Sequence, residues 1–206
     1  MVFGRSERTG TPAAFLVVGL GNPGEEYAGT RHNLGFDVVS RLASRHGGAP
    51  KAGKERARSC EVRVGGVLVA LAEPQTFMNL SGESVRMLVK RHGIDDPGQV
   101  IVVHDELDLP SGRVKVKIGG GTAGHNGLKS VQAHLDSPAF ARVRVGVGRP
   151  PGTQKGIDFV LKRPGKQERV VLDVAVEIAA DAVEMIISSG IERAMNTYNT
   201  EPAATS

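Results

Sequence analysis

Two short runs of apolar residues, each followed by a polar loop, constrain the fold of this chain more than any other feature. The first run, AAFLVVGL at residues 13–20, leads into GNPG, and the second, VIVV at residues 100–103, leads into HDELDLP. Apolar runs of this length without alternation are typical of strands that are covered on both faces. They therefore predict an α/β protein in which helices flank a central sheet.

The rest of the chain alternates between helical and extended patterns. Apolar residues recur at helical spacing in 32–47, 79–93, 123–135 and about 167–189. Extended patterns occupy 112–118 and 140–148, and a hairpin pattern occupies 60–74. Because some strands are joined by helices and others by hairpins, we expect a single three-layer α/β/α domain with a mixed, largely parallel central sheet. The expected organisation is a flexible N-terminal extension (1–14), one catalytic domain (15–200) and a flexible tail (201–206).

Composition and charge are those of an ordinary globular protein with a weak cationic bias. The 206 residues carry a formal net charge of +4, which permits a polyanionic partner without requiring one. The single cysteine, Cys60, has no partner for an internal disulfide and favours a reducing compartment. Since no apolar run reaches membrane-spanning length and the first residues lack the hydrophobic stretch of a signal peptide, we expect a cytoplasmic protein that does not enter a membrane.

The glycine-rich turn GLGNPG, residues 19–24, matches the spacing of a dinucleotide-binding loop. Three features oppose that interpretation. Pro23 lacks a backbone donor that a pyrophosphate needs, the polar segment EEYAGT replaces an apolar helix start, and no acidic strand end follows about twenty residues on. A turn that leaves the side-chain amide of Asn22 exposed explains the glycines better.

A histidine followed by an asparagine occurs twice at an expected helix start after a glycine-rich segment. His32 and Asn33 lie in TRHNLG, and His125 and Asn126 lie in GGGTAGHNG. An imidazole can accept a proton near neutral pH, and a carboxamide can donate to a developing oxyanion. The simpler interpretation of the second pair is a flexible loop followed by an asparagine N-cap. The repetition favours a functional role for both segments.

The end of the second apolar strand carries four titratable side chains within five positions, namely His104, Asp105, Glu106 and Asp108. Such a cluster fits a metal site or a carboxylate that orients a histidine, and the letters DLP also fit an ordinary polar turn. A metal-dependent hydrolase or nuclease that uses His104, Asp105 and Asp108 is therefore one candidate function.

Positive charges alternate along two extended segments in the second half of the chain. Lys115 and Lys117 share a face with Arg113, and Arg142 shares a face with Arg144. Solvated strand faces commonly have this pattern. Two strands with one sign of charge and a glycine-rich loop between them are also compatible with contact to phosphates.

Four stretches, taken in order, resemble the bacterial-type peptidyl-tRNA hydrolases: VVGLGNPGEEYAGTRHNLGF, TFMNLSGES, VVHDELDLPSGRVKVKIGGGTAGHNGLKS and FARVRVGVGRP. The likeness extends from about Phe15 to Thr200, and the shared order and spacing make it specific. It implies an enzyme that hydrolyses the ester between an N-blocked peptide and the terminal ribose of tRNA, and so recycles tRNA from prematurely released peptidyl-tRNA. It also implies a cytoplasmic monomer that needs no metal or other cofactor.

The resemblance also implies roles for individual residues. His32 would be the general base, Asp105 would stabilise it, and Asn22 would distinguish N-blocked from free aminoacyl groups. The positions implied for contact with the peptidyl-tRNA end are Tyr27, Phe77, Asn79 and Asn126, and those implied for contact with tRNA phosphates are Lys115, Lys117 and Arg144. An RNA-binding relative without catalysis is a further alternative, which this complete set of polar residues opposes.

The chain departs from the family pattern after GVG. The segment RPPGTQKG stands where many relatives have His-Pro-Gly followed by a lysine-bearing loop. Arg149 and Lys155 in this segment are candidates for the positive charge of that loop, and the resemblance leaves open whether either residue contacts tRNA.

Overall fold

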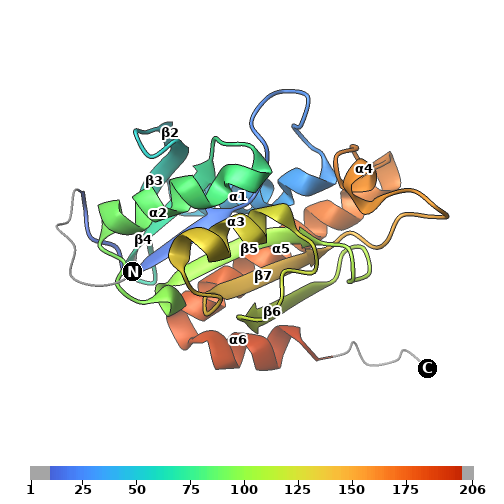
Figure 1. Cartoon of the computed structure of the whole chain (residues 1–206). Coiled ribbons are helices and arrows are strands. Elements are labelled where there is room, and N and C mark those ends of the chain that lie inside the picture. Colours follow the sequence, from blue (N-terminus) through green and yellow to red (C-terminus); the bar gives the residue numbers. More distant parts are fainter. Residues whose placement is uncertain (1–9, 201–206) are drawn as a thin grey trace.

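The computed structural model describes residues 10–200, which fold around one central sheet (Figure 1). Within these residues seven strands form the sheet in the order β2-β3-β4-β1-β5-β7-β6. Their bounds are Phe15–Gly19 (β1), Lys51–Ala52 (β2), Ala57–Val64 (β3), Val67–Pro74 (β4), Val100–Glu106 (β5), Val114–Ile118 (β6) and Ala141–Gly146 (β7). Strands β4, β1, β5 and β7 pair in parallel, whereas β3 and β6 run against their neighbours. The sheet is mixed and largely parallel, as predicted.

Helices cover both faces of the sheet. Their bounds are Leu34–Arg45 (α1), Ser81–His92 (α2), Asn126–Leu135 (α3), Gly156–Val160 (α4), Lys166–Ser189 (α5) and Ile191–Tyr198 (α6). Apolar residues of α1, α5 and α6 build the core on one face, and those of α2 and α3 build a second core on the other. In Figure 1, α2 and α3 lie in front of the sheet and α5 lies behind it. This arrangement confirms the predicted three-layer α/β/α fold.

Two glycines allow β1 to pack closely against the start of α1. A Cβ atom at Gly19 would lie 2.0 Å from the carbonyl oxygen of Gly35, and one at Gly35 would lie 2.3 Å from the backbone nitrogen of Leu20. The chain forms the loop 20–30 and the 3-10 turn η1 (Arg31–Asn33) before α1 begins. The glycines therefore end a strand instead of opening a helix onto a phosphate, which agrees with the rejection of a dinucleotide site.

The carboxyl ends of the parallel strands meet at one edge of the sheet, where open α/β folds bind ligands. There β1 leads toward η1, β4 leads toward the 3-10 turn η2 (Met78–Leu80), and β5 ends with Asp105 and Glu106. The first turn of α3 reaches the same edge, because His125 contacts Asp105. Four separate segments of the sequence thus supply side chains to one place.

The described residues just before β1 pack against the domain. The backbone nitrogen of Ala13 donates to the carbonyl of His92 at 3.1 Å, and that of Ala14 donates to Leu68 at 2.9 Å. Of the segments predicted to be flexible, residues 1–9 and 201–206 lie outside the described range. Among the helices of residues 10–200, none combines the length and the apolar character that crossing a membrane requires.

Candidate active site

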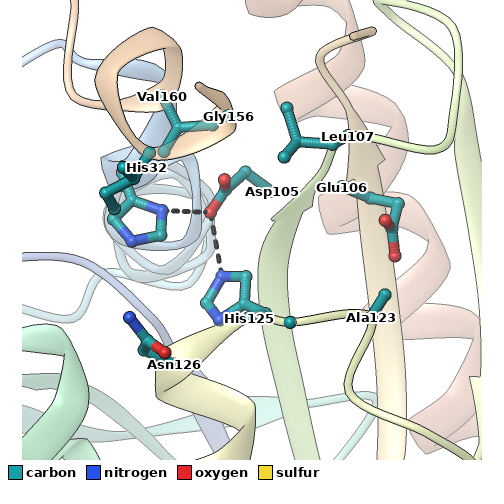
Figure 2. Close-up of a pocket in the computed structure, with 11 residues that line it drawn as sticks. His32, Asp105, Glu106, Leu107, Ala123, His125, Asn126, Gly156 and Val160 are labelled. Atoms are coloured by element: carbon teal, nitrogen blue, oxygen red, sulfur yellow. Dashed lines mark hydrogen bonds and ion pairs between the residues drawn. The ribbon is translucent and has the colours of Figure 1, made fainter.

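His32 and Asp105 are in contact at the carboxyl edge of the sheet, although they are 73 positions apart in the sequence. The Nδ1 atom of His32 lies 2.9 Å from the Oδ1 atom of Asp105, and both residues are buried. His32 belongs to η1, and Asp105 is the last residue but one of β5 (Figure 2). The fold thus brings together the histidine and the carboxylate that the sequence singles out.

A second histidine, His125, binds the same carboxylate oxygen. Its Nε2 atom lies 3.1 Å from Oδ1 of Asp105, and its ring centroid lies 5.0 Å from that of His32. His125 is also the N-cap of α3, since its Nδ1 atom accepts hydrogen bonds from the backbone N–H groups of Gly127 and Leu128. The asparagine cap suggested by the sequence is therefore wrong, and the repeated His-Asn pattern was the one signal for this residue.

The capping contacts determine where the protons lie. Because Nδ1 of His125 accepts two N–H groups, its proton is on Nε2 and is donated to Asp105. Because the carboxylate also accepts from His32, Nδ1 of His32 carries a proton and Nε2 keeps its lone pair in the neutral ring. Figure 2 shows this second nitrogen of His32 turned away from Asp105. His32 therefore presents a basic nitrogen while Asp105 receives two hydrogen bonds.

Burial and the neighbouring charges act in opposite directions at this site. Burial alone would raise the pKa of Asp105, but His32 and His125 outweigh it and hold that pKa well below its usual range. Burial also disfavours the charged form of His32, yet the Asp105 carboxylate outweighs this effect and raises the pKa of His32 above its ordinary value. Asp105 is therefore an anion at neutral pH, and it stabilises a proton that arrives on His32.

A cavity of about 260 Å³ opens beside the two histidines. His32, Asp105, His125 and Asn126 line its polar side, and Figure 2 shows Asn126 on the His32 and His125 side of the cavity. Its apolar lining comes from Leu107, Ala123, Ile157 and Val160. Small-molecule sites commonly have this combination of an apolar wall with a few polar groups.

The wall formed by α4 is attached to the residue next to His32. The Nη1 atom of Arg31 donates to the carbonyls of Phe159 and Lys162, at 3.2 and 3.0 Å. Its Nε and Nη2 atoms form a bidentate pair with Glu168 at 2.7 and 2.6 Å. Arg31 thus links η1, α4 and α5, a role that its sequence context did not indicate because all three partners lie more than a hundred positions away.

Asn22 is buried in a network of amides, so the exposed side-chain amide expected from the glycine-rich turn is wrong. Its backbone nitrogen donates to Oδ1 of Asn33, whose Nδ2 donates back to the carbonyl of Asn22, both at 2.9 Å. The Oδ1 atom of Asn22 accepts from the backbone nitrogen of Met78 at 2.7 Å. Because the oxygen is occupied, the NH₂ group is the part of the Asn22 side chain that is left for a ligand.

Of the residues implied for contact with the peptidyl-tRNA end, Asn126 lines the cavity, whereas Tyr27, Phe77 and Asn79 do not. Phe77 precedes η2 and is 58% exposed, and Asn79 is an exposed residue within η2. A Cβ atom on Gly127 would lie 2.5 Å from the sulfur of Met78, so η2 packs directly against the start of α3. Tyr27 is half-buried in the loop 20–30 and does not line the cavity.

The basic residues of β6 and β7 face one another across the ladder. Lys115 is paired with Arg144, and Lys117 is paired with Arg142. Like charges directly opposite each other destabilise a sheet, so this arrangement fits a surface that meets an anion. The side chains differ, however, because Arg144 forms a 3.0 Å ion pair with Glu106 whereas Arg142 is buried.

The three residues considered from the sequence as metal ligands, His104, Asp105 and Asp108, do not come together around one point. His104 is buried and its Nδ1 donates to the carbonyl of Asp105 at 2.7 Å, while Asp108 pairs with Arg149 at the surface at 2.7 Å. Burial, reinforced by His125, lowers the pKa of His104 to about 3. A site built from His104, Asp105 and Asp108 is therefore wrong. His32, Asp105 and His125 do bring ligand atoms within 4.8 Å of one another, so metal dependence is a question for a chelator assay.

A basic histidine on a buried carboxylate, beside a cavity with amide donors and at the carboxyl edge of a mixed sheet, defines an α/β enzyme suited to general acid–base hydrolysis. Comparison with known proteins identifies the group more closely. The family model described as Peptidyl-tRNA hydrolase matches residues 16–206. The chain belongs to the peptidyl-tRNA hydrolase family.

Individual relatives agree with this assignment. A peptidyl-tRNA hydrolase of Frankia alni is 50% identical over 185 residues, which cover 90% of this chain and 93% of the relative. That of Mycolicibacterium smegmatis is also 50% identical, with coverages of 89% and 96%. The crystal structure of peptidyl-tRNA hydrolase from Acinetobacter baumannii is similar with a TM-score of 0.84 at 37% identity, covering 95% of this chain and 97% of that one.

Proposed function

We propose that this chain hydrolyses the ester between an N-blocked peptide and the terminal ribose of tRNA, with His32 as the general base and Asp105 as the carboxylate that orients it. Membership of the peptidyl-tRNA hydrolase family supports the reaction. The observation that carries the assignment of residues is the 2.9 Å contact between Nδ1 of His32 and Oδ1 of Asp105 beside the cavity.

In the proposed reaction a water molecule attacks the ester carbonyl carbon while Nε2 of His32 takes one of its protons. The tetrahedral oxyanion then collapses, the carbon–oxygen bond to the ribose breaks, and the proton on His32 passes to the leaving ribose oxygen. Asp105 stabilises the imidazolium that exists between these steps. Because water is the nucleophile, the reaction needs no covalent intermediate with the protein.

His125 has a supporting role in this proposal. Its Nε2 proton is donated to Asp105, and its Nδ1 atom is occupied by two backbone N–H groups. Protonation of that Nδ1 would break both capping bonds, so His125 is not a second base. It holds the carboxylate in the position that His32 needs.

The free NH₂ group of Asn22 suggests how N-blocked substrates are selected. A blocked aminoacyl group carries an additional carbonyl, which can accept a hydrogen bond from this NH₂. A free aminoacyl group carries an ammonium at that place, which offers only donors and is costly to desolvate. Asn79 and Asn126 are the candidate donors to the ester oxyanion, a contribution of about 3–4 kcal/mol where such donors have been removed from other enzymes.

The body of the tRNA would lie over the cationic face of β6 and β7, where Lys115, Lys117 and Arg144 contact phosphates. We further expect the protein to act as a monomer in the cytoplasm. The position of the tRNA is inferred from the family resemblance and the net charge of +4, and the monomeric state and the location are inferred from the family resemblance.

One assay tests the proposal against its alternatives. Release of N-acetyl-aminoacyl groups from tRNA is measured beside release of unblocked aminoacyl groups, each with and without a chelator. The proposal expects rapid release of the blocked group only, unchanged by the chelator. Loss of activity on chelation would favour a metal-dependent hydrolase, and tight tRNA binding without turnover would favour an RNA-binding protein.

A further inference from the structure

Arg142, at the second position of β7, is an arginine whose side chain is directed into the protein. The residue is only 1% exposed. Its Nη1 atom donates to the carbonyl of Gly121 at 2.7 Å, its Nη2 atom donates to the carbonyl of Gly120 at 2.9 Å, and its guanidinium lies 4.8 Å from the centre of the Phe140 ring. The hydrogen bonds of this buried cation therefore go to one loop, residues 119–124.

Burial of this charge is not compensated by an acidic partner. The carboxylate of Glu106 pairs with Arg144, and no ion pair of Arg142 occurs within residues 10–200. Burial and the neighbouring Arg144 lower the pKa of Arg142. The Nε atom of Arg142 also lacks a hydrogen-bond partner among the described residues. Burying a cation that forms no ion pair is unfavourable, so stability alone does not explain an arginine here.

The loop held by Arg142 has a conformation that its own sequence stabilises poorly. Four of its six residues have positive φ angles: 59° at Gly119, 85° at Gly120, 46° at Ala123 and 82° at Gly124. A positive φ angle is unfavourable for Ala123 because alanine has a Cβ atom. The glycines lose more conformational entropy than other residues when the loop becomes ordered. The two carbonyls that Arg142 binds, those of Gly120 and Gly121, belong to this poorly stabilised loop.

The loop leads directly to the candidate active site. Its next residues are His125, which binds Asp105, and Asn126, which lines the cavity. We propose that Arg142 is a positioning residue that holds loop 119–124, and through it His125 and Asn126, in register with Asp105. Arg142 binds the loop from beneath and contacts neither substrate nor tRNA. Lys117 and Arg144, in contrast, are proposed to contact tRNA phosphates. The catalytic part of this inference rests on the proposed function.

Two substrates of different size distinguish positioning from phosphate binding. One is full-length N-acetyl-aminoacyl-tRNA, and the other is an N-acetyl-aminoacyl ester of adenosine alone, which has no phosphates. For Arg142→Lys we expect kcat to fall by roughly 10- to 100-fold on both substrates, by the same factor, because a misplaced catalytic group affects any ester. Hydrogen–deuterium exchange of residues 119–126 should become faster in the same variant.

Arg63→Lys is the matched control. Arg63 is an exposed strand arginine that binds the carbonyl of Gly66 at 2.8 Å, in a glycine turn at the opposite end of β4 from the site. It should leave both rates and the exchange of residues 119–126 unchanged. Should Arg142→Lys fail to fold, Arg142→Gln removes the buried charge while keeping a donor for one carbonyl, and the same results are expected of it.

Other outcomes overturn the proposal in identifiable ways. A loss confined to full-length tRNA would mean that Arg142 contacts phosphate, and unchanged exchange would mean that the loop holds itself. If the wild-type protein hydrolyses neither substrate, the proposed function fails, and the exchange measurement still decides whether Arg142 holds the loop.

Discussion

The Nε2 atom of His125 donates a hydrogen bond to the Oδ1 atom of Asp105, the oxygen that also binds His32, at a distance of 3.1 Å. Two imidazoles thus share one buried carboxylate oxygen, and the second imidazole is itself fixed as the cap of α3. The position of Asp105 therefore depends on the first turn of a helix that begins more than twenty positions away in the sequence.

Capping and catalysis can be separated at His125. In His125→Asn the new side chain can still cap α3, but it is too short to reach Asp105, so kcat should fall while stability is retained. In His125→Ala the cap is lost as well, and the free energy of unfolding should be ~1 kcal/mol lower than in the wild type. Urea unfolding and steady-state kinetics of both variants provide the measurement. Equal kcat in His125→Asn and the wild type would remove the supporting role.

Replacement of the base should affect chemistry and leave binding intact. For His32→Ala we expect kcat to fall by about 10²- to 10⁴-fold, the usual contribution of a general base. Binding of peptidyl-tRNA, measured by filter retention, should change little because the cationic face is untouched. His134→Ala is a suitable control, since this histidine bonds only to the carbonyl of Ser130 within the described residues. Substantial turnover without His32 would show that another group activates water.

Asp105→Asn should change the pH dependence in a definite direction. The carboxylate raises the pKa of His32 against the effect of burial, so without it burial should bring that pKa down. Activity requires neutral His32, and the acid limb of the kcat/KM profile should therefore move to lower pH while its plateau falls. Glu184→Gln, which removes the 3.0 Å partner of the surface residue His46, should not move the profile. An acid limb that stays in place would exclude this coupling.

Selection of N-blocked substrates can be tested at one atom. Asn22→Asp keeps an oxygen for the N–H of Met78 but replaces the free NH₂ with an acceptor that attracts an ammonium. The ratio of blocked to unblocked hydrolysis should fall by roughly tenfold, which corresponds to one hydrogen bond of about 1.4 kcal/mol. Both rates are measured on tRNA charged with the same amino acid. An unchanged ratio would place the discrimination on another residue.

The proposed contacts of Lys115 and Lys117 with tRNA phosphates should make tRNA binding depend on salt concentration. For Lys115→Ala and Lys117→Ala we expect weaker tRNA binding and a reduction of about 1 in the slope of log K against log salt for each contact removed. Lys51→Ala, an exposed residue in β2 at the far edge of the sheet, controls for net charge. Slopes equal to those of the control would move the phosphate contacts elsewhere.

Sequence patterns predicted the elements better than the contacts. The hairpin around Gly65 and Gly66, the helix that ends at Gly93 and the long C-terminal helix all form where their patterns indicate. In contrast, Arg142 and Arg144 have the same alternation in sequence, yet one is buried under a loop and the other pairs with Glu106. Alternation assigns a face of the strand, and it does not say what covers that face.

The sequence by itself determined the fold class and the family, because apolar runs, glycine turns and the four ordered stretches are local features that can be recognised in the sequence. It also supplied His32 and Asp105 as a pair through that resemblance. Only the tertiary structure decided that His125 shares their carboxylate, that the oxygen of Asn22 is occupied by Met78, and that Arg142 holds a loop. These facts depend on the directions of individual side chains from elements that are distant in the chain. A hydrogen bond requires its two atoms to lie about 3 Å apart, and packing, not sequence periodicity, determines that distance.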